Sequence, residues 1–249
     1  MTQGTVTQPE ESKALAPQAV HLFEVAGVPF VVRPQDVAFH MGIFWLLLRF
    51  VGFAYPHLPT PFRWLVGMMW YVMFVVSDTA HSVGHILSAR AANAPVNVIS
   101  TALGLQVTVY YENKVKPVQH LGRAAGGPAI SALLAAEAHL IYRVAKHIPI
   151  LRTVVRTWRA ANLIVLGVAL IPSPSFDGSS LLKWAVAQIT GEEALGEDAV
   201  QGAGFVVSGG LVLAGLVMLL RRRILYGLGF IGAGFYAALD LSLLHGRIG

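Results

Sequence analysis

Apolar stretches of about the length of a membrane span dominate this sequence. A helix needs about 20 mostly apolar residues to cross the hydrocarbon core of a bilayer. Charged residues make up only 12% of the chain, about half of the roughly 25% found in soluble domains. The sequence therefore predicts an all-α, polytopic membrane protein with about six transmembrane helices, at Val37–Tyr55, Trp64–Ala89, Ala124–Tyr142, Ala160–Phe176, Ala199–Leu220 and Ile224–Leu244.

The residues before the first span differ from the rest of the chain. Residues 1–20 are polar and lack the basic start and apolar centre of a signal peptide, so we expect a loose tail. Residues 21–36 are short apolar pieces broken by glycine and proline, which predicts a lead-in segment. We therefore divide the chain into a tail and lead-in, residues 1–36, and a single transmembrane domain, residues 37–249.

One segment between the second and third spans does not follow a helical pattern. Val96–Tyr111 is rich in β-branched residues that partly alternate with polar ones, which predicts a small strand-like insert. Because lipid does not tolerate bare strand edges, this insert must pair with itself, pack on protein or lie at the interface.

The basic residues flank the apolar stretches and form no single patch. Three loops on one side (residues 55–64, 143–159 and 221–223) hold nine Lys and Arg and no acid, and the other side holds eight Lys and Arg mixed with acids. The positive-inside rule then places the three loops in the cytoplasm. We expect an integral, multi-pass protein of the cell (inner) membrane, whose surroundings are the lipid bilayer and which binds no nucleic acid.

The second span ends in a group of ionisable residues. His81 and His85 are four residues apart and project from one helix face, a spacing that lets two imidazoles bind one metal ion, and Asp78 shares that face. In a soluble helix, simple packing would explain such a pair more often than metal binding does. Ionisable groups at bilayer depth are costly and usually mark function, so we interpret this group as a candidate site.

A third ligand is expected at the end of the fourth span. The second and fourth spans run in the same direction, so Asp177 can meet His81 and His85 on one side of the membrane. Zinc with three nitrogen or oxygen ligands and one open position is the usual catalytic arrangement. The chain holds no cysteine, which excludes thiolate ligands.

At these residues the chain resembles the site-2 protease family of intramembrane zinc metalloproteases. That family carries HExxH on one membrane helix and an Asp-Gly motif on another. The stretches AHSVGHILSAR (residues 80–90) and IPSPSFDGSSLL (residues 171–182) resemble these two motifs, and Gly127–Ser131 is similar to the family's GxxxN/S/G helix. The resemblance covers a protease-like core at about residues 62–190.

The resemblance carries expectations about the site. It implies a Zn²⁺ cofactor on His81, His85 and Asp177, and a substrate cleft lined by Gly127 and Ser131. It also implies a membrane-spanning protein segment as substrate or partner.

The chain departs from the family where the motif has its glutamate, because Ser82 stands there. Serine cannot act as a general base at neutral pH, and acid–base assistance contributes about 10²–10⁴-fold to rate. Two carboxylates could substitute: Asp78, one turn earlier, as a base or as an acceptor that orients His81, and Glu137 on the third span. The sequence thus favours a pseudoprotease or impaired metalloprotease. An active protease with a substitute base and a metal-free structural membrane subunit are the alternatives.

Overall fold

The computed structural model describes residues 19–102 and 104–248, with the side chains of Leu225 and residues 240–248 excluded. The predicted N-terminal tail lies almost wholly outside the described residues. The chain divides into two compact units. The first holds the chain up to Tyr71 together with Asn97–Tyr110, and the second holds Val72–Val96 together with Tyr111 onwards.

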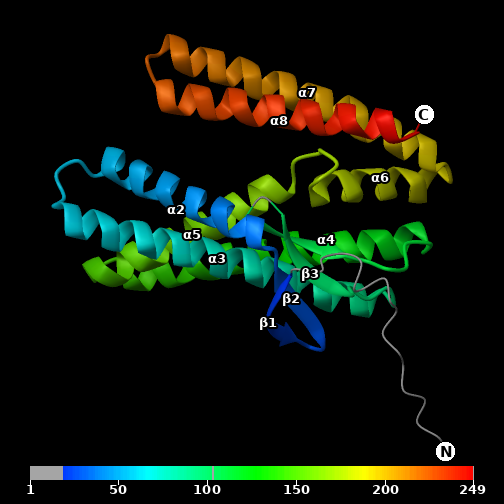
Figure 1. Ribbon diagram of the computed structural model, residues 1–249, viewed down its shortest axis with the longest axis horizontal. Helices are drawn as coiled ribbons and strands as arrows, with labels where there is room; N and C mark the ends of the chain where they lie inside the picture. Colours follow the sequence, from blue (N-terminus) through cyan, green and yellow to red (C-terminus); the bar gives the residue numbers. More distant parts are fainter. Residues whose placement is uncertain (1–18, 103, 249) are drawn as a thin grey trace, which may run out of the picture. The chain divides into compact units, whose positions relative to one another are not determined.

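The described chain is mostly helical, with seven α-helices (Figure 1). Five of the six predicted apolar stretches fall on helices over almost their whole length. The bounds of the fourth, Ala160–Phe176, are wrong: the helix there runs from Pro149 to Ala169 and ends before Pro172 and Pro174, and a shorter amphipathic helix follows. The helices are α2 (Pro34–Ala54), α3 (Thr60–Ala91), α4 (Pro117–Ala145), α5 (Pro149–Ala169), α6 (Asp177–Thr190), α7 (Glu193–Leu220) and α8 (Ile224–Ile248).

Three of the described helices are long and apolar enough to cross a membrane: α2, α4 and α7. Helix α8 contains a shorter apolar segment, Tyr226–Leu239. The expectation of several membrane spans is therefore met in part. Helices α3 and α5 are less apolar because α3 carries Asp78 and its two histidines, and three arginines lie in the first part of α5.

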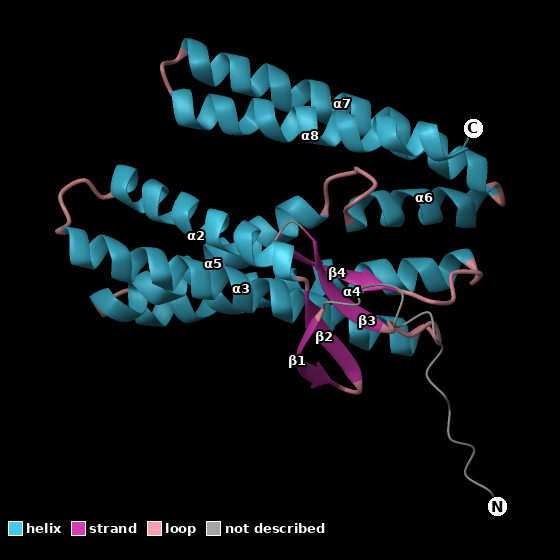
Figure 2. Cartoon of the chain, in the orientation of Figure 1, coloured by secondary structure: helices cyan, strands magenta, loops and turns pink. Residues whose placement is uncertain are grey.

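A four-stranded sheet accompanies the helices (Figure 2). Its strands, in spatial order, are β1 (Val20–Val25), β2 (Val28–Val32), β3 (Val98–Ala102) and β4 (Leu105–Val109). Both hairpins are antiparallel, and β2 pairs with β3 in parallel. The predicted strand-like insert is confirmed as β3 and β4.

The β1–β2 hairpin was not predicted, and the all-α expectation is wrong to that extent. Ala26 and Gly27 both have positive φ, as the two central residues of a type I′ hairpin turn require. Gly27, expected only to break an apolar segment, lies in the turn between two short strands. Pro29 lies within β2, and Pro34 begins α2.

A buried carboxylate joins the sheet to α2 within the first unit. Asp36, at 1% exposure, accepts hydrogen bonds from Arg33 Nε at 2.9 Å and from Thr101 Oγ1 at 2.8 Å. Arg33 precedes α2 and Thr101 lies on β3. Both of these contacts come from donors, and they stabilise the buried charge of Asp36.

In the second unit, α3 and α4 cross with their backbones in contact. A methyl group on Gly84 would overlap the carbonyl of Gly126, and a methyl group on Gly126 would overlap the carbonyl of Gly84. Helix α4 also packs against α5 and α6, and the last helices, α7 and α8, lie side by side (Figure 1). This close crossing brings one face of α4 against the histidines of α3.

Candidate metal centre

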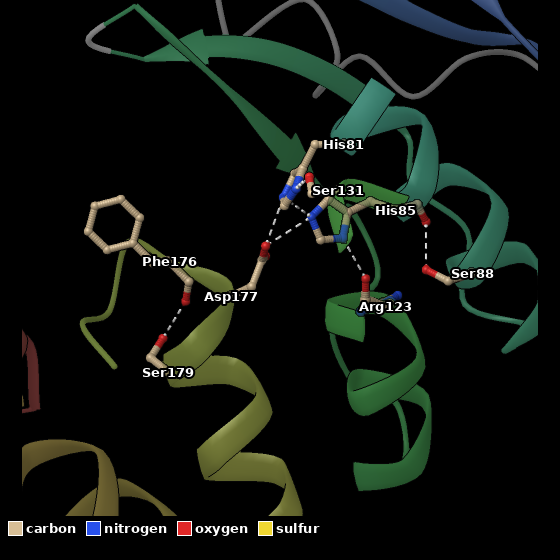
Figure 3. Close-up of polar contacts among 8 residues, drawn as sticks. All are labelled: His81, His85, Ser88, Arg123, Ser131, Phe176, Asp177 and Ser179. Carbon is tan, nitrogen blue, oxygen red and sulfur yellow. Dashed lines mark hydrogen bonds and ion pairs between the residues drawn. The ribbon is translucent and has the colours of Figure 1, made fainter. Parts of the chain in front are cut away.

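His81, His85 and Asp177 come together in the second unit (Figure 3). His81 Nε2 lies 2.9 Å and His85 Nε2 lies 3.2 Å from Asp177 Oδ2, and the two Nε2 atoms are 3.1 Å apart. Both imidazoles are buried, and the Asp177 side chain is 22% exposed. Two helices, α3 and α6, thus bring together three side chains that could hold a metal ion.

The orientation of His85 is fixed by the backbone of α4. Its Nδ1 lies 2.7 Å from the carbonyl oxygen of Arg123. Because a carbonyl oxygen only accepts hydrogen bonds, Nδ1 carries the proton. In the neutral imidazole, Nε2 then presents a lone pair toward Asp177 and His81.

The carbonyl of Arg123 is itself held in place by the arginine side chain. The buried guanidinium donates hydrogen bonds from Nε to the carbonyl of Ala94 at 2.8 Å and from Nη2 to the carbonyl of Glu112 at 2.7 Å. Nη1 also donates to Asn113 Oδ1 at 3.2 Å. These contacts tie the start of α4 to the segments that follow α3 and precede α4.

His81 is oriented by Ser131, two turns further along α4. Its Nδ1 lies 2.9 Å from Ser131 Oγ, and the serine is completely buried. Between these two anchors, Gly127 faces the imidazoles: a methyl group there would overlap the Nε2 atoms of both His81 and His85. One face of α4 therefore orients both histidines and leaves space beside their Nε2 atoms.

Asp177 begins helix α6, where the helix dipole favours a negative charge. The loop before it returns tightly, because a methyl group on Gly178 would overlap the carbonyl of Leu170. Ser179 Oγ donates a hydrogen bond to the carbonyl of Phe176 at 2.8 Å.

The chemistry of these three side chains favours a bound cation. The lone pair of His85 Nε2 and the carboxylate oxygen Oδ2 of Asp177 both accept, yet they lie 3.2 Å apart. A proton or a metal ion between them would resolve this conflict. Zinc bonds of about 2.0–2.1 Å in tetrahedral geometry separate ligand atoms by roughly 3.3 Å, and the three observed separations of 2.9, 3.1 and 3.2 Å fit that arrangement.

The other residues singled out in the sequence lie at distinct places. Ser82 is buried on α3 at 1% exposure, and Asp78 is buried one turn before it at 7%. Glu137 lies exposed on α4. Gly127 and Ser131, predicted to line a substrate cleft, contact the imidazole pair.

Sequence reasoning missed the contribution of Arg123. Its carbonyl, not its charge, orients His85, and no side-chain pattern signals which carbonyl a histidine will meet. The only signal near Arg123 is the run of small residues that follows it, up to Gly127. Small residues indicate that this part of α4 can approach another helix closely, but they do not indicate which carbonyl a histidine contacts.

Comparisons with known proteins agree with this geometry. The chain superimposes on the structure named “Site-2 Protease from Methanocaldococcus jannaschii” with a TM-score of 0.55, at 17% identity, over 88% of this chain and 94% of that one. It is 28% identical over 177 residues, 67% of its length, to “Putative zinc metalloprotease sll0528” of Synechocystis sp.. It is also 28% identical over 227 residues, 88% of its length, to “Putative zinc metalloprotease Rip3” of Mycobacterium tuberculosis.

The chain is similar to two proteins named putative zinc metalloproteases, and its likeness to the solved structure shows its fold. It has the site-2 protease fold and a His-His-Asp group that could hold a metal ion. No protein-family model matches the chain. The chain spans about half the length of the curated relatives it matches, 44% of one and 57% of the other.

Proposed function

We propose that this chain is a zinc-binding intramembrane protein of the site-2 protease type, with His81, His85 and Asp177 as its ligands. The observation that carries the proposal is the convergence of two imidazole Nε2 atoms and one carboxylate oxygen within 3.2 Å of one another. The backbone carbonyl of Arg123 supports this assignment, because it leaves a lone pair on His85 Nε2.

The proposal extends to a pseudoprotease or impaired protease. A bound zinc ion supplies a Lewis acid that polarises a carbonyl and activates water. Ser82 occupies the position of the family's general base, and its hydroxyl does not accept a proton at neutral pH. Without that base, hydrolysis should be slower by about 10²–10⁴-fold, while the ligands and the cleft remain able to bind.

The occupant of the cleft is proposed to be a membrane-spanning segment, either a substrate or a partner helix, in the cell membrane. The relatives named zinc metalloproteases and the three apolar helices of this chain support a partner within the bilayer. The protease-like core at about residues 62–190 contains all three ligands and both residues assigned to the cleft.

A slow, active protease is the second candidate. Asp78 favours it, because this buried carboxylate lies one turn before Ser82 on the same helix. At that distance along the helix it could move a proton through an intervening water. A metal-free structural subunit is the third candidate, and metal analysis separates it from the other two.

The test combines metal content with peptide cleavage on one preparation. The full chain, purified in detergent, should contain about one zinc ion, lost in His81→Ala. Reconstituted with single-span membrane proteins, the wild type should cleave none efficiently, and Ser82→Glu should gain activity by about 10²–10⁴-fold.

Each outcome selects one function. Efficient cleavage by the wild type, lost in Asp78→Asn, would replace the pseudoprotease with a protease that uses a substitute base. Folded, zinc-free wild type that resists zinc loading would leave the structural subunit. Ser82→Gln is the matched control for Ser82→Glu, because glutamine has the shape of glutamate without the basic carboxylate.

A further inference from the structure

Helices α4 and α5 form a groove that the metal centre does not use. The groove has a volume of about 380 Å³ and is lined by three alanines of α4 (Ala132, Ala135, Ala136) and two leucines of α5 (Leu163, Leu166). His139 and Arg159 complete its lining. Its volume is within the roughly 300–1,000 Å³ of small-molecule sites, and most of its wall is apolar.

The groove has a polar end and an apolar part. Its polar end lies at His139, six residues before α4 ends at Ala145, and at Arg159, the middle residue of α5 (Pro149–Ala169). From these two residues the apolar lining extends over seven residues on each helix, about 10 Å at 1.5 Å per residue. The groove therefore joins a cationic end to an apolar surface with the length of an acyl-chain segment.

Arg159 has no acidic partner among the residues that the structure describes. Its guanidinium donates from Nη1 to His139 Nδ1 at 3.1 Å and lies 5.5 Å from the centre of the Tyr142 ring. A guanidinium has five N–H donors, so others remain for an anion. Because His139 Nδ1 accepts this bond, the neutral imidazole carries its proton on Nε2, which provides one more donor.

The surrounding sequence is predominantly basic. Residues 138–176 lie between Glu137 and Asp177 and contain five Lys and Arg and no acid: Arg143, Lys146, Arg152, Arg156 and Arg159. Basic pockets between transmembrane helices on the cytoplasmic side bind anionic headgroups. Guanidinium groups match the geometry of phosphate oxygens particularly well.

We propose that this groove binds one anionic phospholipid. The phosphate contacts Arg159 and His139. One acyl chain lies between the alanines of α4 and the leucines of α5. The ligand is a lipid and not free phosphate, because the apolar lining has the length of an acyl-chain segment. This site is independent of the proposed zinc centre.

The test is native mass spectrometry of the full chain released from detergent. Phosphatidylglycerol and phosphatidylcholine with the same acyl chains are added at equal concentrations, and the retained lipid is counted. The wild type should retain about one phosphatidylglycerol in preference to phosphatidylcholine. Arg159→Gln should weaken this retention by about tenfold or more, as expected for loss of hydrogen bonds to a charged group.

Two matched controls separate the groove from general attraction. Arg156→Gln removes the same charge from an exposed position one turn earlier that does not line the groove, and it should have a much smaller effect. Ala136→Phe fills the groove and should lower retention as strongly as Arg159→Gln does. Ala233→Phe, on an exposed face of α8, should leave retention unchanged. Melting temperatures of all four variants show that each is folded.

Several results would overturn the proposal. Equal retention of the two lipids would exclude recognition of the anionic headgroup, and equal losses in the two arginine variants would show general electrostatic attraction. Displacement by inorganic phosphate, with no effect of Ala136→Phe, would indicate a simple anion site. A dimer that Ala136→Phe disrupts, without selective lipid retention, would show that a second copy of the chain covers the groove.

Discussion

Two carboxylates in this molecule, Asp36 and Asp177, differ in what surrounds them. Asp36 is buried among donors, with Arg33 Nε at 2.9 Å and Thr101 Oγ1 at 2.8 Å. Asp177 faces two imidazoles, and the backbone contact of His85 leaves an acceptor on the side toward the carboxylate. The first carboxylate meets an arginine and a threonine donor, whereas the second lies 2.9 Å from His81 Nε2 and 3.2 Å from the acceptor His85 Nε2, an arrangement that favours a bound cation.

This difference separates a structural charge from a candidate functional one. Burial is stronger for Asp36, so burial alone would point to the wrong residue. What distinguishes Asp177 is the chemistry of its neighbours. Buried polar groups that meet donors stabilise a fold, and groups that meet acceptors at close range indicate a missing positive charge.

The largest expected effect comes from filling the space beside the imidazoles. Gly127→Ala places a methyl group where it overlaps the Nε2 atoms of His81 and His85. Zinc affinity, measured by competition with a chromophoric chelator, should fall by more than about 100-fold, beyond the 10–100-fold typical of outer-shell changes. Gly167→Ala, on α5 with open space around it, is the control and should bind zinc normally. Unchanged zinc affinity in Gly127→Ala would show that the ion, if bound, lies elsewhere.

The next prediction tests the Asp36 side of the comparison. Asp36→Asn keeps the shape of the side chain but removes the charge that Arg33 and Thr101 contact. The free energy of unfolding should fall by about 1.5–3 kcal/mol, the usual value for hydrogen bonds to charged groups. Zinc content should not change.

Asp177→Asn is the matched substitution on the other side. In protein stripped of metal by a chelator, it should leave the free energy of unfolding unchanged or raise it, because a conflict between acceptors is removed. Equal destabilisation by Asp36→Asn and Asp177→Asn would contradict the distinction between the two carboxylates.

A smaller effect is expected from the support of His81. Ser131→Ala removes the hydroxyl 2.9 Å from His81 Nδ1 and should weaken zinc binding by about 10–100-fold. Ser208→Ala is the control, since Ser208 Oγ is also buried but has no hydrogen-bond partner within the described structure. If both serine variants bind zinc like the wild type, Ser131 does not orient the ligand, and only its predicted place in the cleft remains.

The smallest effect concerns a third ionic group, which is partly exposed. Lys183 on α6 contacts Glu193 at 2.6 Å and Glu197 at 2.9 Å on α7. Burial alone would lower the pKa of Lys183, but the hydrogen bonds with these glutamates raise that pKa above its ordinary value. Its stabilising contribution is therefore complete below the ordinary lysine pKa and disappears as pH rises through the raised pKa.

Lys183→Met should accordingly lower the free energy of unfolding by about 0.2–1 kcal/mol near neutral pH. The difference from the wild type should vanish at alkaline pH, as followed by thermal unfolding in detergent. A difference that stays constant with pH would mean that the side-chain stem, and not the charge, supplies the stabilisation.

The sequence predicted the parts of this fold that depend on local pattern. The apolar stretches marked the helices, and β-branched residues marked β3 and β4. The spacing of His81 and His85, with the direction of the helices, was enough to expect their meeting with Asp177. The first hairpin was missed because Gly27 and Pro29 interrupt a segment too short to show clear alternation.

The support of the site could not be predicted in the same way. Which atoms meet His81 and His85 depends on the crossing of α3 and α4, and Gly84 and Gly126 allow that crossing through backbone contact. A sequence shows that small residues are present but not which partner they approach. The roles of the Arg123 carbonyl and of Ser131 follow from this packing and not from a motif.

X-ray absorption spectroscopy at the zinc edge of the purified full chain tests the central claim most directly. We expect about one tightly bound zinc per chain, with two imidazole nitrogens and carboxylate or water oxygens at about 2.0–2.2 Å, and loss of that signal in Asp177→Ala but not in Asp36→Ala. Zinc that is absent after loading, or a signal unchanged by Asp177→Ala, would contradict a metal centre at His81, His85 and Asp177.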